Sequence, residues 1–331
     1  MQLPDVQATN PDVMIGLTSV GVTEVKKLIE IKRGGGKRPI ILIPTFDIFV
    51  DLPSDRKGAN LSRNLEVIDR TLEEAVQDPV YAIEDLCVDV SKNLLDKHEY
   101  ATVAEVKMKG EYMMRKKSPV TQMECQEVYD IYADAKVYRN GEVRKTIGAT
   151  VIAMTACPCA QELSRDLAFK KLQNFGLSDA DIAEFLNDMP MPTHNQRGVG
   201  SITIESGEGV RVSLDSIINI IENSMSSQMY ELLKREDERH VVMTAHKNPK
   251  FVEDCVRTMT KNLVDAFQND LPDDSVITIT QTNEESIHRH NAFAERAATF
   301  GELKKEVLAN SKAVAKEANP VQGKAMKKAT P

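Results

Sequence analysis

The feature that most constrains the fold of this chain is an order of elements in which strand-like segments flank a pair of helix-like segments. Residues 40–52 are rich in β-branched and aromatic side chains, which is typical of a strand. In the two segments that follow, 61–76 and about 80–94, apolar residues recur at helical spacing. The strand candidates that come next lie at 100–109, 124–138 and 146–156.

The second half of the chain repeats this order more loosely. Its candidate elements are a strand at 199–205, helices at 214–223 and 251–267, and a strand at 276–282. From about Glu302 the chain is rich in Lys, Ala and Glu, which predicts a helix that frays at its end. We therefore expect an α+β fold made of a first unit at 1–156, a second unit at 157–300 and an extension at 301–331.

Composition and charge narrow the class of protein. Of the 331 residues, 41% are hydrophobic and 28% are charged, as in an ordinary soluble protein. No apolar run approaches the roughly 20 residues of a membrane helix, and residues 1–10 lack a signal pattern, so we expect a cytoplasmic protein with no membrane partner. The formal net charge of -8 argues against a nucleic-acid partner, and any bound phosphate should be met by a local basic cluster.

Two cysteines stand directly after an apolar strand candidate, in the sequence Cys157-Pro158-Cys159. The chain has five cysteines, an odd number that favours a few functional thiols over a disulfide framework. A strand end can aim a thiol rigidly at a metal or substrate. The alternative is that one cysteine packs as a small hydrophobe.

Four further polar segments carry chemistry of the same kind. His194 lies among Thr, Asn, Gln and Arg, which suits a site residue or a histidine of a surface loop. Residues 234–240 are dense in charge, as is also usual at a solvated helix end. Glu253 opens an amphipathic helix, where an acid can simply complement the helix dipole. His288 and His290 would share one face of a strand and suit metal or phosphate, although this spacing is common by chance.

Taken together, these motifs resemble the family that joins bacterial type IB GTP cyclohydrolases to archaeal GTP cyclohydrolase IV of the MptA type. The resemblance covers roughly residues 5–300. The motifs that carry it are CPC at 157–159, HNQR at 194–197, KREDE at 234–238, FVED at 251–254, ESIHRH at 285–290, VGVTEVKKLIEI at 20–31, FDIFVDLP at 46–53 and KGANLSR at 57–63.

Two features favour the archaeal branch of this family. A long segment, which we describe as an insertion at 160–193, separates Cys157 from His194, and the tail after the last motif is long. One departure concerns Asn60, which stands where the bacterial motif carries a histidine, so no role of that histidine transfers to this chain.

The resemblance implies a tunnelling fold with two ββααββ-like modules in tandem, antiparallel sheets and helices on one face. It also implies a homo-oligomer, a dimer or a tetramer, with active sites at subunit interfaces and an inactive monomer.

The resemblance also implies roles for individual residues. Cys157 and His194 match metal ligands, and Glu238 matches an acidic residue at the metal. Glu253 matches the anchor of the purine ring. Glu285 and His288 match an acid and a histidine beside the metal. His288 could be a ligand or an acid/base group, and we expect it mainly to move protons.

The triphosphate of the substrate needs cationic contacts, which an acidic chain must supply locally. The candidates for these contacts are Arg56, Lys57, Arg63, Lys234, Arg235 and His290.

The activity implied is hydrolysis of GTP. A metal-activated water would open the guanine imidazole ring, release formate and yield 7,8-dihydroneopterin 2',3'-cyclic phosphate and diphosphate, the first step of tetrahydromethanopterin synthesis. The metal implied is Fe(II), although the ligand types equally permit zinc, and manganese remains open.

Three other functions stay open at this point. The bacterial-type reaction would give 7,8-dihydroneopterin triphosphate. A nitrile reductase of the same fold would use a cysteine nucleophile, but it does not need the HNQR and ESIHRH motifs. A structural site in a non-catalytic pterin- or metal-binding module would need only about four ligands. Titratable and ligand-type residues occur in five of the motifs, CPC, HNQR, KREDE, FVED and ESIHRH, which argues against such a module.

Overall fold

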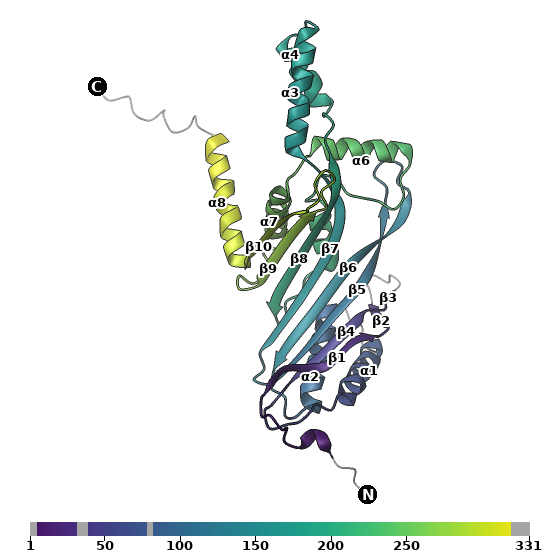
Figure 1. Ribbon diagram of the computed structural model, residues 1–331, viewed down its shortest axis with the longest axis vertical. Helices are drawn as coiled ribbons and strands as arrows, with labels where there is room; N and C mark the ends of the chain where they lie inside the picture. The colour runs from purple at the N-terminus through teal and green to yellow at the C-terminus, as the bar shows by residue number, and fades with distance from the viewer. Residues whose placement is uncertain (1–4, 32–38, 78–81, 319–331) are drawn as a thin grey trace, which may run out of the picture.

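The computed structural model describes residues 5–31, 39–77 and 82–318, and one antiparallel sheet of eight strands runs through it (Figure 1). The strands of this sheet, in spatial order, are β1 (Leu17–Lys26), β4 (Thr45–Leu52), β5 (Val103–Lys117), β6 (Glu124–Tyr138), β7 (Val143–Ala156), β8 (Asn195–Gly207), β9 (Val276–Asn283) and β10 (Ala292–Thr299). A separate two-stranded sheet pairs β2 (Ile29–Ile31) with β3 (Ile40–Leu42).

The helices differ in length and in what they cover. They are the short 3-10 helix η1 (Val6–Ala8), then α1 (Ser62–Gln77), α2 (Ile83–Lys97), α3 (Pro158–Asn174), α4 (Asp179–Asp188), α5 (Leu214–Glu222), α6 (Arg235–Lys247), α7 (Val252–Phe267) and α8 (Phe300–Ala318). Among the residues described, no helix is long and apolar enough to cross a membrane.

The main helices cover one face of the sheet. Cross-strand partners lie on the same face, and the buried residues of neighbouring strands are partners: Ile48 pairs with Val106, and Ile202 pairs with Ile279. Against this buried face, α2 packs on β5, β6 and β7, α5 on β7 and β8, and α7 on β9 and β10. The predictions of antiparallel strands and of helices on one face are confirmed.

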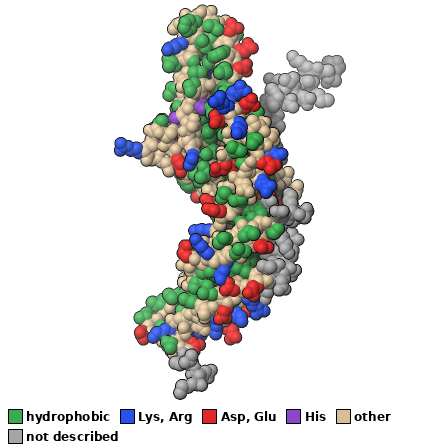
Figure 2. Space-filling view, turned by 90° about the vertical axis from the view of Figure 1, so that its right-hand side faces the viewer, with side chains coloured by type: hydrophobic (Ala, Val, Ile, Leu, Met, Phe, Trp, Pro, Cys, Tyr) green, Lys and Arg blue, Asp and Glu red, His purple; other side chains and the backbone are tan. Residues whose placement is uncertain are grey.

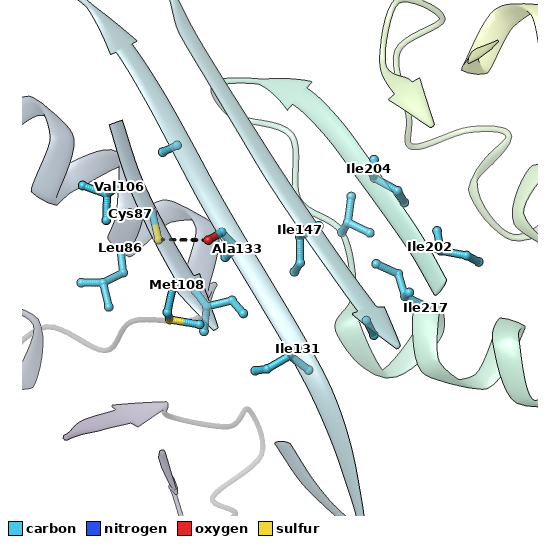
Figure 3. Close-up of a cluster of buried hydrophobic side chains, with 14 of the residues drawn as sticks. Leu86, Cys87, Val106, Met108, Ile131, Ala133, Ile147, Ile202, Ile204 and Ile217 are labelled. Carbon is cyan, nitrogen blue, oxygen red and sulfur yellow. Dashed lines mark hydrogen bonds between the residues drawn. The ribbon is translucent and has the colours of Figure 1, made fainter. Parts of the chain in front are cut away.

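The core is continuous across the middle of the sheet. Leu86 of α2 and Ile217 of α5 lie over the same array of buried strand side chains (Figure 3). The sheet is also continuous there, because β7 pairs with β6 on one side and with β8 on the other. The boundary expected at 156 and 157 therefore coincides with the end of a central strand.

Several elements differ from those expected from the sequence. The strand expected at 40–52 is two strands, interrupted at Pro44, and the first of them belongs to the small sheet. The segment 285–290 is not a strand, because β9 ends at Asn283 and β10 begins at Ala292. The insertion at 160–193 is mainly the helical hairpin α3–α4, which projects from one end of the sheet (Figure 1).

Candidate active site

Three of the motifs meet at the end of the sheet from which the helical hairpin projects. Neighbouring antiparallel strands place the end of one beside the start of the next. Ala156, the last residue of β7, is the cross-strand partner of Asn195, the first residue of β8. On the other side of β8, the N–H of Glu284 donates to the carbonyl of Arg197 at 2.9 Å. The CPC, HNQR and ESIHRH motifs therefore lie on three adjacent chain segments.

Cys157 occupies the N-cap position of α3 and is half-buried. Its sulfur accepts a hydrogen bond from the N–H of Ala160 at 3.5 Å, at a helix start where backbone N–H groups stabilise negative charge. Its own N–H donates to the carbonyl of His194 at 3.1 Å. Cys159 is exposed. Of the two thiols, Cys157 is therefore the one held against the histidine segment.

His194 is connected to Glu285 through Gln196, a residue of the HNQR motif to which the sequence analysis assigned no role. Nδ1 of His194 lies 3.0 Å from Oε1 of Gln196 and 3.9 Å from Oε2 of Glu285. The side-chain amide nitrogen of Gln196 donates to Oε1 of Glu285 at 3.5 Å. The hydroxyl of Ser286 lies 3.4 Å from the same ring nitrogen. The side chains of His194 and Glu285 are 14% and 13% exposed, so these two side chains are largely shielded from bulk water.

Glu253 lies close to this end of the sheet, in the first turn of α7 as predicted. The N–H of Lys250 donates to the carbonyl of Ala156 at 3.0 Å, which fixes the segment before α7 to the end of β7. Burial lowers the pKa of Lys250, whose ammonium donates to the carbonyl of Ser224. The neighbouring acid, Asp254, accepts the N–H of Phe251 and so performs the capping role. The side chain of Glu253 is exposed.

The helix α6 lies across the same end of the sheet (Figure 1). Its C-terminal end borders α3, because the side chain of Gln161 donates to the carbonyl of His246 at 2.7 Å. Glu238 stands eight residues earlier, about 12 Å along the axis at 1.5 Å per residue, and is exposed. The structure therefore does not bring Glu238 together with Cys157 and His194.

The charged segment at the start of α6 contains a residue with a structural role, Asp237, that the sequence pattern did not predict. Asp237 is fully buried and accepts hydrogen bonds from the N–H groups of Val120, Thr121 and Lys234, and from the hydroxyl of Thr121. Burial alone raises the pKa of Asp237, but these hydrogen bonds outweigh it and hold the pKa below its usual range. Asp237 thus ties the β5–β6 turn to α6. Lys234 and Arg235 are exposed beside it.

His288 and His290 lie in the turn between β9 and β10, and both are exposed. Their rings are stacked, with centroids 5.2 Å apart and an angle of 18° between the planes. The two rings thus lie side by side although the expected strand is absent. Figure 2 shows histidine side chains on the surface near the base of the helical hairpin.

The basic residues of the KGANLSR motif lie at the opposite end of the sheet. Arg63 donates to the carbonyl of Lys97 at 3.0 Å, and Arg139 donates to the carbonyl of His98 at 2.9 Å. Arg139 precedes the turn that leads into β7, whose 14 residues span about 40 Å at roughly 3.3 Å per residue. Cys157 follows the far end of β7. Arg63 and Cys157 of one chain are thus too far apart to contact the same nucleotide.

The other two cations of that region lie near Arg63. The guanidinium of Arg56 stacks over the ring of Tyr100, 4.0 Å from its centroid, and Lys57 is exposed. Two hollows on the helix-free face of the sheet contain none of the predicted site residues; one is bordered by Phe49 and Lys136, the other by Lys109 and Met113.

The donor types present suit a divalent metal, although the described part of the chain does not assemble a full set of ligands. Cys157 and His194 offer a sulfur and an imidazole at adjacent strand ends. Among the described residues, no group of three or more His, Cys, Asp or Glu lies close enough to hold a metal ion. A metal held by Cys157 and His194 would therefore need a further ligand from water, substrate or another segment.

Comparison with known proteins agrees with the motifs. A family model described as "Type I GTP cyclohydrolase folE2" matches residues 3–294. GTP cyclohydrolase MptA 1 of Methanocella arvoryzae is 77% identical over 310 residues, 94% of this chain and 98% of the relative. GTP cyclohydrolase MptA of Methanosarcina mazei is 61% identical over 311 residues, 92% of this chain and 97% of the relative.

Solved structures give a weaker comparison. Uricase from Arthrobacter globiformis covers 87% of this chain and 96% of its own, with 11% identity and a TM-score of 0.47, which is too weak a likeness to decide fold or function. The family model, by contrast, spans most of the chain and includes every motif named above. The chain therefore belongs to the type I GTP cyclohydrolase family, with close relatives that carry the name MptA.

Proposed function

We propose that this chain hydrolyses GTP to 7,8-dihydroneopterin 2',3'-cyclic phosphate, formate and diphosphate, as the first enzyme of tetrahydromethanopterin synthesis. The observation that carries the proposal is the pairing of Ala156 with Asn195, which places Cys157 beside the His194 segment. The relatives named MptA support the choice of the archaeal branch, as does the helical hairpin that occupies the insertion at 160–193.

The proposed metal is Fe(II), held by Cys157 and His194. A bound divalent metal lowers the pKa of its water and supplies hydroxide near neutral pH. Glu238 remains a proposed acidic residue at the metal, but one that must reach it by movement or from a neighbouring subunit, because within one chain it lies about 12 Å along α6 from the end that borders α3.

The chain's own residues would bind and orient the substrate. Glu253, exposed on the first turn of a rigid helix, can accept hydrogen bonds from the N1–H and 2-amino groups of guanine. His288 can transfer protons as the ring opens and formate departs. Glu285, held between His194 and Gln196, can accept a proton or a hydrogen bond beside the metal.

The positions of the cations support an active site shared between subunits. Lys234, Arg235 and His290 lie at the same end of the sheet as Cys157, whereas Lys57 and Arg63 lie about 40 Å away. If the KGANLSR residues bind the triphosphate, another copy of the chain must supply them. We therefore propose a homo-oligomer, a dimer or a tetramer, in which both ends of the sheet meet at each active site.

The element order supports the finer description of the fold as a tunnelling fold. The elements β1, β4, α1, α2, β5 and β6 follow the order ββααββ, and β7, β8, α5, α7, β9 and β10 repeat it. In this arrangement the edge strands β1 and β10, which have no neighbour on their outer sides in the described sheet, would pair with other copies.

The test is anaerobic incubation of the full chain with GTP and Fe(II), followed by mass analysis of the pterin and measurement of formate. We expect the cyclic phosphate as product and no turnover of ATP, because adenine lacks the donors that Glu253 would bind. Dihydroneopterin triphosphate would instead assign the bacterial type of reaction. Metal binding without formate release would overturn the enzymatic proposal.

A further inference from the structure

We infer that Gln196 is a positioning residue that sets the orientation of His194 and Glu285 together. The side chain of Gln196 is 9% exposed and lies on the buried, helix-covered face of β8. It contacts both residues at once, the imidazole through its amide oxygen and the carboxylate through its amide nitrogen. This inference rests on the proposed role of His194 as a metal ligand.

Only one orientation of the amide satisfies both neighbours. The carboxylate of Glu285 accepts hydrogen bonds, so it needs the NH₂ of Gln196, which leaves the amide oxygen facing Nδ1 of His194 at 3.0 Å. An amide oxygen can only accept, so Nδ1 must carry the hydrogen. The lone pair of the neutral ring is then on Nε2, which is the nitrogen available to a metal.

The oxygen atoms around Nδ1 point to the same assignment. Ser286 Oγ and Glu285 Oε2 lie 3.4 Å and 3.9 Å from Nδ1, so the amide oxygen is one of three oxygens facing it. The amide and carboxylate oxygens only accept hydrogen bonds and the hydroxyl of Ser286 can also accept, so an N–H at Nδ1 is compatible with all three. Gln196 is the member of this group that also holds the carboxylate, so it couples the ring orientation to the position of Glu285.

A second buried amide on the same face offers a matched control. Gln281 of β9 is fully buried, and its NH₂ donates to Asn283 Oδ1 at 3.0 Å and to the sulfur of Met225 at 3.5 Å. It shares the polar interior next to Gln196, since a Cβ built on Gly198 would lie 2.5 Å from its nitrogen. None of the hydrogen bonds described for Gln281 involves His194.

A positioning role and a packing role of Gln196 predict opposite rankings of metal affinity for the variants Gln196→Met and Gln196→Glu. Methionine matches glutamine in length but neither accepts from Nδ1–H nor donates to Glu285. Glutamate still accepts from Nδ1–H but places a second carboxylate beside Glu285. If Gln196 only fills space, Gln196→Met is the milder change and Gln196→Glu the more harmful one, because burying a charge is costly. If Gln196 orients the ring, metal binding is weaker in Gln196→Met.

The experiment measures the affinity for Co(II), without GTP, by anaerobic competition with a chromogenic chelator. The proteins compared are the wild type, Gln196→Met, Gln196→Glu, Gln281→Met and His194→Ala. We expect about 10- to 100-fold weaker binding in Gln196→Met, the usual effect of removing a residue that orients a ligand. Gln196→Glu should bind within a few-fold of the wild type but release formate slowly, and Gln281→Met should bind as the wild type does.

The outcomes separate this inference from the proposed function. Wild-type affinity in Gln196→Met, or weaker binding in Gln196→Glu than in Gln196→Met, would overturn the role of Gln196. Retention of metal by His194→Ala would instead overturn the ligand assignment of the proposed function. If thermal melting shows that Gln196→Met does not fold, the comparison of Gln196→Glu with the wild type decides, with lost affinity counting against the role.

Discussion

Arg63 and Cys157 lie at opposite ends of the same sheet, separated by roughly the 40 Å length of β7. Both belong to motifs that carry the resemblance to the family, yet no nucleotide can contact both within one chain. If both residues act at one active site, as we propose, two chains must meet there. In an active site at a subunit interface, one chain would then contribute Arg63 and another would contribute Cys157.

Subunit complementation tests this statement directly. Arg63→Ala and Cys157→Ser should each be nearly inactive alone. When the two are co-expressed with different tags and purified as mixed oligomers, some sites receive both wild-type residues, and GTP turnover should return. A matched control combines Cys157→Ser with His194→Ala, whose residues lie at the same end of one chain, and this pair should stay inactive. Recovery of GTP turnover in both mixtures, or in neither, would contradict the proposal that Arg63 and Cys157 of one active site come from different chains.

The anchor role of Glu253 predicts a loss of guanine recognition. Glu253→Gln keeps the side chain's shape but replaces an acceptor oxygen with a donor group. Binding of GTP should weaken by at least the roughly 1.5–3 kcal/mol of a hydrogen bond to a charged group. Isothermal titration with metal-free protein measures this without turnover. An unchanged kcat/KM for GTP in Glu253→Gln would contradict the anchor role and would leave Glu253 only the role of complementing the helix dipole.

The two cysteines of the CPC motif should behave differently. Cys157 is held against the His194 segment, whereas Cys159 is exposed. Cys157→Ser should lose most metal and activity, and Cys159→Ser should keep both. Because a thiol must lose its proton to bind a metal, wild-type affinity should also rise with pH. The measurement is the metal content after anaerobic loading. Full metal occupancy in Cys157→Ser would show that Cys157 is not a required ligand.

A comparison of His288 with His194 separates proton transfer from metal binding. His288 is exposed in a turn, stacked on His290, while His194 is largely buried beside Glu285. His288→Ala should retain metal and bind GTP but release formate about 10²–10⁴ times more slowly. His194→Ala should lose metal as well as activity. Equal metal loss in the two variants would make His288 a ligand.

A buried carboxyl far from the active site predicts a pH-dependent stability. Glu84 of α2 is almost fully buried, neither of its oxygens has a hydrogen-bond partner in the described structure, and Lys145 lies 3.9 Å away. Burial raises the pKa of Glu84 from 4.5 to about 7, although the charge of Lys145 partly opposes this shift.

The sign follows from the raised pKa of Glu84. Between about pH 4.5 and 7 the unfolded chain releases this proton while the folded chain keeps it, so stability falls as pH rises. The cost reaches its full value above pH 7, on the order of 3 kcal/mol. Glu84→Gln should therefore raise the melting temperature more at pH 8 than at pH 5. The matched change Glu66→Gln, at an exposed position of α1, should show no such difference.

The sequence determined the elements whose patterns are local. The apolar stripe at 251–267 predicted α7, and the strand candidate at 124–138 has the observed bounds of β6. The motifs also led us to propose metal ligands at Cys157 and His194, because thiol and imidazole groups commonly bind metals. By contrast, β10 has the sequence AFAERAAT, which has little strand propensity, and its eight pairings with β9 make it a strand.

Only the tertiary structure decided which of these residues act together. Gln196 gained its link to Glu285 because β8 and β9 are neighbours, although the two residues are 89 positions apart. Asp237 looks in the sequence like one more exposed acid in a charged run. It is buried and hydrogen-bonded because the β5–β6 turn brings the N–H groups of Val120 and Thr121 to it. Local periodicity reports which side of an element is buried, whereas strand order and register set the contacts between distant segments. For this reason the sequence could suggest candidate site residues but could not show that Arg63 lies a full strand length from Cys157.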